Sequence, residues 1–89
     1  MPTVQVIIKG KVRGVYYRAS AKKQARELGI YGEIKNTREG HVEAIVSGNE
    51  REIEAFVNWC RQGPAGAIVT HVEVSSLPPG DFKDFRIVH

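Results

Sequence analysis

The chain has 89 residues, 42% of them hydrophobic and 26% charged, so it can supply one core but not two. Its formal net charge of +3 favours anionic partners but is too small to identify one. No stretch approaches the ~20 apolar residues that span a bilayer, and the first residues do not resemble a signal peptide. A single cysteine, Cys60, excludes an internal disulfide and fits a reducing compartment. We therefore expect one cytoplasmic domain over residues 1–89, without a membrane partner.

The first half of the chain predicts a strand, a helix and a hairpin. Residues 4–8 largely alternate between apolar and polar, as in a strand with one buried face. From Tyr17 the apolar residues recur at helical spacing, and Gly29 stands where a left-handed residue ends a helix. Residues 30–37 and 42–46 alternate again on either side of a glycine-containing turn, which indicates a β-hairpin.

The second half predicts a helix and two strands. Asn49 is a favourable N-cap, and Glu52 stands three residues on, where it can return a hydrogen bond. An apolar stripe follows and ends at Gly63, and strands are expected at 68–74 and 85–87. The order β-α-β-β-α-β with one further strand predicts an α+β, ferredoxin-like (split β-α-β) sandwich. In it an antiparallel sheet carries two helices on one face.

The segment Gly10–Arg18, between the first strand and the first helix, suits an anion. Its glycines allow the backbone to approach a ligand, so that successive N–H groups can converge into a concave nest. The first helical turn adds unpaired N–H groups and the positive end of the helix dipole. Arg18 carries a fork of donors that matches phosphate oxygens. Most strand–loop–helix junctions bind nothing, so the residues alone leave both interpretations open.

This segment, Gly-Lys-Val-Arg-Gly-Val-Tyr-Tyr-Arg, resembles the signature of the acylphosphatase family, Gly-x-Val-Gln-Gly-Val-x-Phe-Arg. Further landmarks that resemble the family follow in order: Leu28-Gly29-Ile30-Tyr31-Gly32, Lys35-Asn36-Thr37 with Gly40 and Val42, Gly63-Pro64 with Ala67 and Val69, and Phe85-Arg86-Ile87. Together they cover essentially the whole chain, and several spaced motifs are more specific than any one of them.

The resemblance implies hydrolysis of an acyl phosphate to a carboxylate and inorganic phosphate, without metal or cofactor, by a monomer that phosphate inhibits. Arg18 matches the family's substrate-binding arginine, and Asn36 matches the catalytic asparagine that positions the attacking water. The backbone N–H groups that would form the phosphate cradle, together with Arg18, belong to Val12, Arg13, Gly14, Val15, Tyr16 and Tyr17. Thr37 either holds the side chain of Asn36 or simply fills a strand position.

Four positions depart from the family pattern. Arg13 stands where glutamine is usual, Tyr17 replaces phenylalanine, Glu33 replaces a frequent aromatic, and His89 replaces a common terminal tyrosine. Because Tyr17 lies on the core face of its helix, we expect its hydroxyl to need a hydrogen-bond partner or a route to solvent. The departures leave the substrate preference open.

The remaining reactive residues indicate no second chemistry. His41, His71 and His89 are scattered and show no metal-ligand spacing with Cys60, which completes an apolar helical stripe and is expected to be buried and inert. Two non-catalytic alternatives remain: a module that binds single-stranded RNA, or one that binds a phosphorylated metabolite. RNA-binding modules of this topology stack bases on aromatic residues of the central strands, and residues 41–47 contain none. We therefore expect no nucleic-acid partner.

Overall fold

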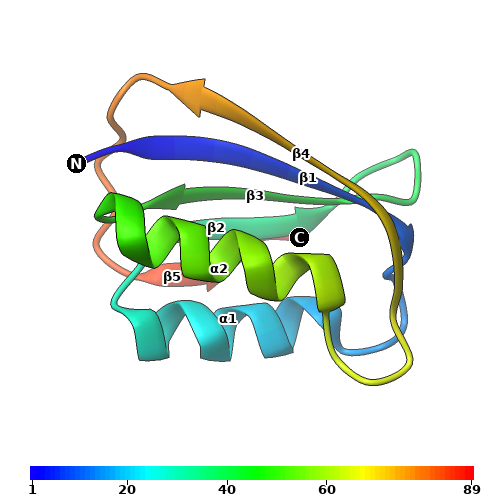
Figure 1. Cartoon of the computed structure of the whole chain (residues 1–89). Coiled ribbons are helices and arrows are strands. Elements are labelled where there is room, and N and C mark those ends of the chain that lie inside the picture. Colours follow the sequence, from blue (N-terminus) through cyan, green and yellow to red (C-terminus); the bar gives the residue numbers. More distant parts are fainter.

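The computed structural model describes all residues, 1–89, as one sheet with two helices on one face (Figure 1). The elements in chain order are β1 (Thr3–Lys11), α1 (Tyr17–Leu28), β2 (Tyr31–Asn36), β3 (Val42–Ser47), α2 (Glu50–Gln62), β4 (Ile68–Leu77) and β5 (Phe85–Ile87). The strands lie in the order β4-β1-β3-β2-β5. The predicted ferredoxin-like α+β sandwich is confirmed.

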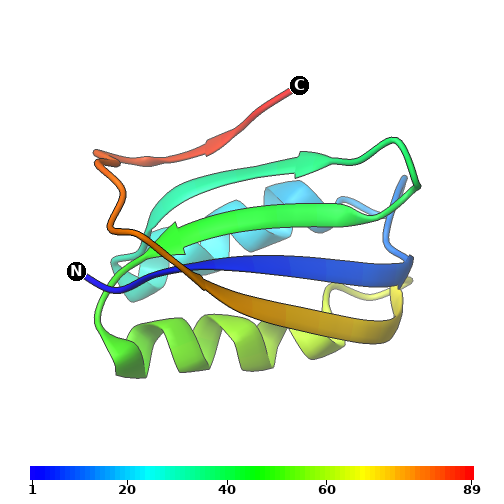
Figure 2. The ribbon, with the colours of Figure 1, turned by 90° about the horizontal axis from the view of Figure 1, so that it is seen from above.

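The sheet is antiparallel except at one edge. β1 pairs antiparallel with β3 and β4, and β3 pairs antiparallel with β2. β5 runs parallel to β2, with Gly32 opposite Phe85, so the sheet is mixed where a wholly antiparallel one was expected. Figure 2 shows the reason: the chain leaves β4 at one edge, crosses the end of the sheet and enters β5 at the other edge. It therefore starts β5 from the end at which β2 also starts.

The core lies between the sheet and the helices. Because side chains alternate along a strand, every second residue of the sheet faces the helices, and the helices add their apolar stripes. The buried hydrophobic residues are Val6, Ile8, Val12, Tyr17, Ala21, Ala25, Ile30, Ile34, Val42, Ala44, Val46, Ile53, Phe56, Val57, Cys60 and Phe85. Phe56 packs against Phe85 with ring centroids 5.9 Å apart, which joins α2 to the edge strand β5.

The helix ends follow the local sequence signals. The Asn49 side chain accepts from the backbone N–H of Glu52 at 2.9 Å, and its amide donates to the Glu52 carboxylate at 2.8 Å. Gly29 ends α1 with φ 73°, a left-handed conformation, and its N–H donates to the carbonyls of Ala25 and Arg26. Both predicted ends are confirmed.

Tyr17 ties the start of α1 to the end of α2. Its side chain is buried, and its hydroxyl donates to the carbonyl of Cys60 at 2.7 Å. That carbonyl belongs to the last turn of α2, where no intrahelical N–H is available to it. Burial raises the pKa of Tyr17, so the hydroxyl remains a donor. A Cβ at Gly63 would lie 2.6 Å from the Tyr17 ring, so the close fit also requires a glycine there.

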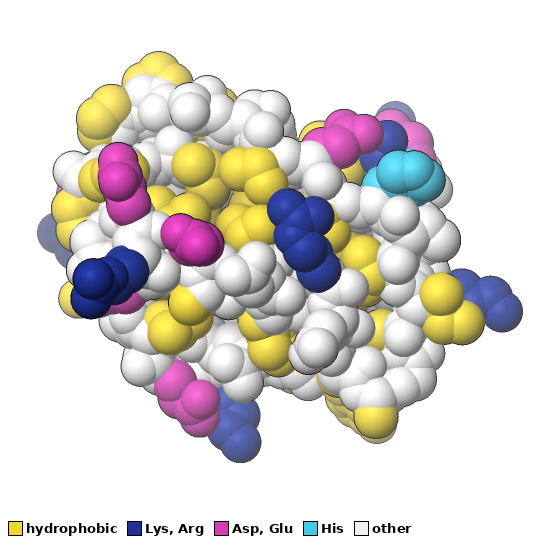
Figure 3. Space-filling model, viewed as in Figure 1, with side chains coloured by type: hydrophobic (Ala, Val, Ile, Leu, Met, Phe, Trp, Pro, Cys, Tyr) yellow, Lys and Arg dark blue, Asp and Glu magenta, His cyan; other side chains and the backbone are white.

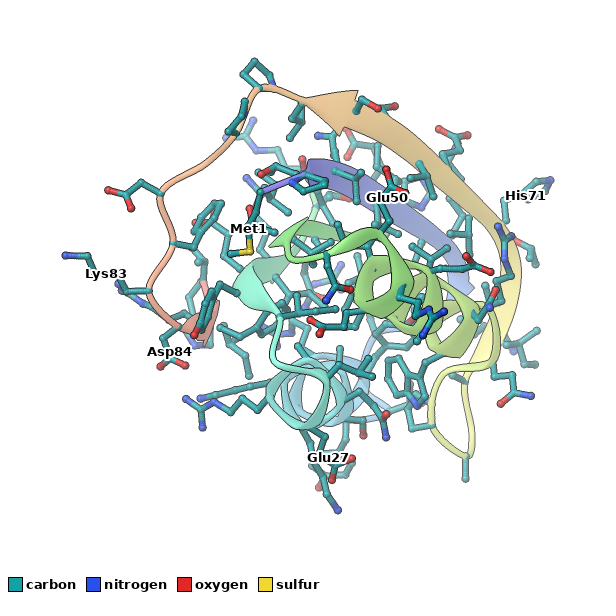
Figure 4. The ribbon with its side chains drawn as sticks, turned by 60° about the vertical axis from the view of Figure 1, so that its left-hand side comes forward. Met1, Glu27, Glu50, His71, Lys83 and Asp84 are labelled. Carbon is teal, nitrogen blue, oxygen red and sulfur yellow. The ribbon has the colours of Figure 1, made fainter.

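Asp84 fastens β5 to its neighbours. Its Oδ1 accepts from the N–H of Phe85 at 2.7 Å, its Oδ2 accepts from Arg26 at 3.1 Å, and its carbonyl accepts from the N–H of Gly32 at 2.9 Å. Figure 4 shows Asp84 at the end of the segment that leads into β5. The Phe85 amide, and after it the Arg26 guanidinium, hold the pKa of the Asp84 carboxyl below its ordinary value.

The Tyr17 hydrogen bond predicts a loss of stability on Tyr17→Phe. The substitution keeps the ring but leaves a buried carbonyl without a donor, which costs about 1–3 kcal/mol. We expect the free energy of unfolding, measured by guanidinium denaturation, to fall by that amount. Tyr16→Phe is the matched control, because the Tyr16 side chain is 84% exposed and its hydroxyl donates to no protein group. Equal stabilities of the two variants would contradict the structural role of the hydroxyl.

The lowered pKa of Asp84 predicts an acid-dependent loss of stability. A carboxyl whose pKa is lower in the folded state stabilises above its unfolded pKa, and this contribution disappears as the pH falls through the folded value. Acidification from about pH 5 to about pH 2 should therefore lower the denaturation midpoint of the unmodified protein more than that of Asp84→Asn. Asp81→Asn, a change of an exposed carboxylate without such partners, should retain the full acid dependence.

Candidate active site

The loop between β1 and α1 has an unusual backbone. Gly14 has φ 71° and Tyr16 has φ 59°, and Tyr16 is the only residue other than glycine with a positive φ. A Cβ at Gly14 would meet nothing within 4 Å, so this glycine is required for its left-handed conformation and not for space. Buried residues, Val12 and Tyr17, stand on either side of the loop and hold it against the core.

The N–H groups of this loop are unpaired. None of the backbone N–H groups of residues 12–16 donates to a backbone carbonyl. The first bond of the helix runs from the N–H of Ser20 to the carbonyl of Tyr16, so the N–H groups of residues 17–19 also lack a helical acceptor. Donors are therefore free over one continuous stretch of backbone, as a site for an anion requires.

The two helix N-termini differ in charge. α2 has an Asn49 cap and two acidic residues, Glu50 and Glu52, in its first turn. α1 has no side-chain cap and no acidic residue there. The positive end of the α1 dipole is thus not offset by any carboxylate of its own first turn, and it is available to an external anion.

Arg18 lies in the first turn of α1 and faces the same pocket as the loop. The ion pairs of the structure join Lys9 to Glu73, Arg26 to Asp84 and Lys35 to Glu43. None of them uses Arg13 or Arg18. Since no aspartate or glutamate lines the pocket, no acidic side chain there neutralises either guanidinium group.

Asn36 is the last residue of β2 and lies on the helix-bearing face, two positions beyond the buried Ile34. Its Oδ1 is buried and has no hydrogen-bond partner. A buried acceptor without a donor is costly, so a turn of the side chain that brings this oxygen to a donor in the pocket would be favourable. This is the only buried side-chain nitrogen or oxygen atom without a partner.

Thr37 forms hydrogen bonds with His41 and not with the side chain of Asn36. Its Oγ1 accepts from the N–H of His41 at 3.1 Å, and its N–H donates to the His41 carbonyl at 2.8 Å. The residue thus closes the turn between β2 and β3. No hydrogen bond joins it to the side chain of Asn36, which it can position only through the backbone.

One pocket of about 420 Å³ brings most of these residues together. Its lining residues are Val12, Arg13, Gly14, Tyr16, Tyr17, Arg18, Ala19, Asn36, Ile87 and His89. Of the residues that the sequence predicted for the cradle, only Val15 is not among them. Its side chain is partly buried and approaches Gly66, with Cγ1 3.7 Å from the position of a Cβ there.

Ala19, Ile87 and His89 were not predicted as site residues. Ile87 lies opposite Ile34 in the parallel β2–β5 pair, and the N–H of Val88 donates to the Ile34 carbonyl at 2.8 Å. This pairing carries the end of the chain alongside Asn36. The sequence indicated a strand and a family landmark at Phe85-Arg86-Ile87 and a departure from the family pattern at His89, but no local pattern reveals which edge of a sheet a three-residue strand will join.

The other reactive residues stay outside the pocket, apart from His89. No three histidine, cysteine, aspartate or glutamate residues lie close enough together to hold a metal ion. Cys60 is fully buried, and burial raises the pKa of its thiol to about 12, so it is not a nucleophile at neutral pH. Its expected burial is confirmed. Neither helix has the length and apolar character needed to cross a bilayer.

The open face of β1 and β3 carries no aromatic side chain. These strands present residues such as Ile7, Glu43 and Ile45 there, and Tyr31 of β2 is the aromatic residue on this face. On this face Gln5 and Lys35 both contact the carboxylate of Glu43, so the charge of Lys35 is paired. On the helix-bearing face, basic and acidic side chains are interspersed and form no continuous basic surface (Figure 3).

Comparison with known proteins identifies one family. The profile of the acylphosphatase family matches residues 4–87. An acylphosphatase of Syntrophus aciditrophicus is 43% identical over 90 residues, which cover 100% of this chain and 94% of that protein. The structure of an acylphosphatase from Coxiella burnetii has a TM-score of 0.95 at 34% identity, over 98% of this chain and 92% of that one. The Bacillus subtilis acylphosphatase has a TM-score of 0.96 at 28% identity, over 100% of both chains. The chain belongs to the acylphosphatase family.

Proposed function

We propose that the chain hydrolyses acyl phosphates in the pocket at the β1–α1 junction. The phosphoryl group would lie between Arg18 and the N–H groups of Val12 to Tyr17, while Asn36 orients the attacking water. The observation that carries this proposal is the meeting, in one pocket, of unpaired amides, an arginine without an ion pair and a carboxamide with a partnerless buried oxygen. Membership of the acylphosphatase family supports the reaction class.

The loop and Arg18 would bind the phosphoryl group and stabilise charge on its oxygens. Backbone N–H groups held by a folded loop need no reorganisation when charge develops, which makes such donors effective. The first turn of α1 adds its dipole, and Arg18 adds a fork of two parallel N–H donors. These groups would supply the positive charge that a divalent cation supplies in many phosphoryl-transfer enzymes, so we propose a metal-independent reaction without a cofactor.

Asn36 would position the water. A carboxamide does not take up a proton at neutral pH, so it cannot act as a general base, but its oxygen can accept a hydrogen bond from water. A turn of the side chain would bring the buried Oδ1 to this water and give it the donor it lacks. The attacking oxygen would then be held in line with the bond to be broken, and its proton would pass to a phosphoryl oxygen of the substrate.

The leaving group explains why no general acid is required. Cleavage of an acyl phosphate releases a carboxylate, which is stable without protonation. We propose that the protein acts as a monomer and as one domain over residues 1–89, because one chain contains every group that this reaction would use. The free thiol of Cys60 is compatible with a cytoplasmic location.

Phosphate binding can be measured without turnover. At about 100 times its dissociation constant, inorganic phosphate should raise the free energy of unfolding by about 2.7 kcal/mol, because it binds only the folded chain. We expect the corresponding rise in Tm to disappear in Arg18→Ala. Arg51→Ala is the matched control, since it removes the same charge from an exposed position of α2 and should keep the rise. An equal loss in both variants would indicate a general charge effect and contradict the site.

The reaction is tested by hydrolysis of benzoyl phosphate in excess EDTA. We expect activity that survives chelation and is inhibited competitively by inorganic phosphate. Arg18→Ala and Asn36→Ala should each lower kcat/KM by about 10²-fold or more, the usual effect of removing a preorganised donor or orienting group.

Asn58→Ala, a change of an exposed asparagine on α2, serves as the control for Asn36→Ala and should keep the full rate. Full activity in Asn36→Ala would remove the role of this residue in orienting water. Activity that returns only on addition of a divalent cation would overturn the metal-independent mechanism. Phosphate binding without turnover would indicate a module that binds a phosphorylated metabolite.

A further inference from the structure

The pocket has room for more than a phosphoryl group. Its volume of about 420 Å³ falls within the range of about 300–1,000 Å³ that is typical of sites for small organic ligands. Half of its lining residues are hydrophobic, two are the arginines Arg13 and Arg18, and none has an acidic side chain. Beside the amides and Arg18, the pocket therefore offers accessible apolar side chains, those of Tyr16 and Ile87, that an acyl group can contact.

Tyr16 has no evident role in folding. Its side chain is 84% exposed, and it forms no cap for α1 although it occupies the N-cap position. Its hydroxyl has no hydrogen-bond partner in the protein, in contrast to that of Tyr17. Tyr16 also holds a left-handed conformation, φ 59° and ψ 27°, which is unfavourable for a residue with a side chain and would suit glycine. Backbone strain of this kind is concentrated at functional sites.

Tyr16 belongs to the cradle and carries an exposed ring. Its own N–H belongs to the unpaired stretch, and the residue lines the same pocket, as does Ile87 of β5. In an acyl phosphate the acyl carbon is joined to phosphorus through a single oxygen. An acyl group whose phosphoryl group lies in the cradle must therefore lie next to the residues that form the cradle wall.

We propose that Tyr16 determines the specificity for the acyl group, by packing its ring against an aromatic acyl group while the phosphoryl group lies in the cradle. The inference rests on the proposed function of the site. Aromatic rings attract one another beyond the effect of the buried area, in offset or edge-to-face arrangements. An exposed tyrosine ring also loses little side-chain freedom when it packs, because only two torsion angles become fixed. An acetyl group is too small to cover the ring and gains little from it.

The test compares benzoyl phosphate with acetyl phosphate through the ratio of their kcat/KM values. Tyr16→Ala should lower this ratio by about 5–10-fold, the size expected for one lost aromatic pair. Tyr16→Phe keeps the ring and should restore the ratio to that of the unmodified protein. Tyr31→Ala is the matched control, because Tyr31 is a partly exposed tyrosine of β2 on the opposite face of the sheet, and the ratio should not change.

Two further measurements separate the role of the ring from damage to the loop. Inorganic phosphate has no acyl group, so its inhibition constant reports the cradle alone. Tyr16→Gly relieves the left-handed strain and should unfold at the same temperature as the unmodified protein or higher, while lowering the ratio as Tyr16→Ala does.

The outcomes distinguish this inference from the proposed function. If both substrates are hydrolysed and Tyr16→Ala leaves the ratio unchanged, the assignment of Tyr16 is wrong and the reaction stands. The assignment is also wrong if Tyr16→Ala lowers both kcat/KM values equally and weakens phosphate inhibition, because the ring would then only support the cradle. If the unmodified protein hydrolyses neither substrate, the proposed function itself fails.

Discussion

Unpaired backbone amides between β1 and α1 are the feature on which the site depends, and the rest of the structure keeps them in place. Buried Val12 and Tyr17 stand on either side of the loop, and the Tyr17 hydroxyl reaches the last turn of α2. The loop conformation is thus tied to both helices and to the sheet. Such a loop presents its donors without a reorganisation cost on binding, which is the advantage of backbone groups over flexible side chains.

The N-termini of the two helices differ in how their unpaired N–H groups and positive dipole ends are used. At the start of α2, Asn49 and Glu52 satisfy each other, so this N-terminus is stabilised from within and offers little to a ligand. At the start of α1, Tyr16 provides no cap and no carboxylate approaches in the first turn. This N-terminus gives up the local stabilisation of a cap, and it thereby leaves a positive dipole end free beside Arg18.

The pocket also depends on an edge strand that is only three residues long. β5 is held by the parallel pairing with β2, by packing of Phe85 against Phe56, and by the hydrogen bonds of Asp84 to its neighbours. These contacts bring Ile87 to the wall of the pocket. The pocket is therefore composed of four segments, the β1–α1 loop, the first turn of α1, the end of β2 and the end of the chain. Only the folding of the sheet places them together.

The sequence by itself determined the features that depend on neighbours along the chain. Apolar periodicity predicted the order of strands and helices, Gly29 and Asn49 marked helix ends, and the spaced motifs that begin with Gly10–Arg18 indicated the family. The tertiary structure decided what depends on pairing between distant segments. It placed β5 parallel to β2, brought the end of the chain to Asn36 and turned Thr37 toward the hairpin. Local periodicity cannot specify such contacts, because the choice between sheet edges depends on the core that the whole chain has already formed.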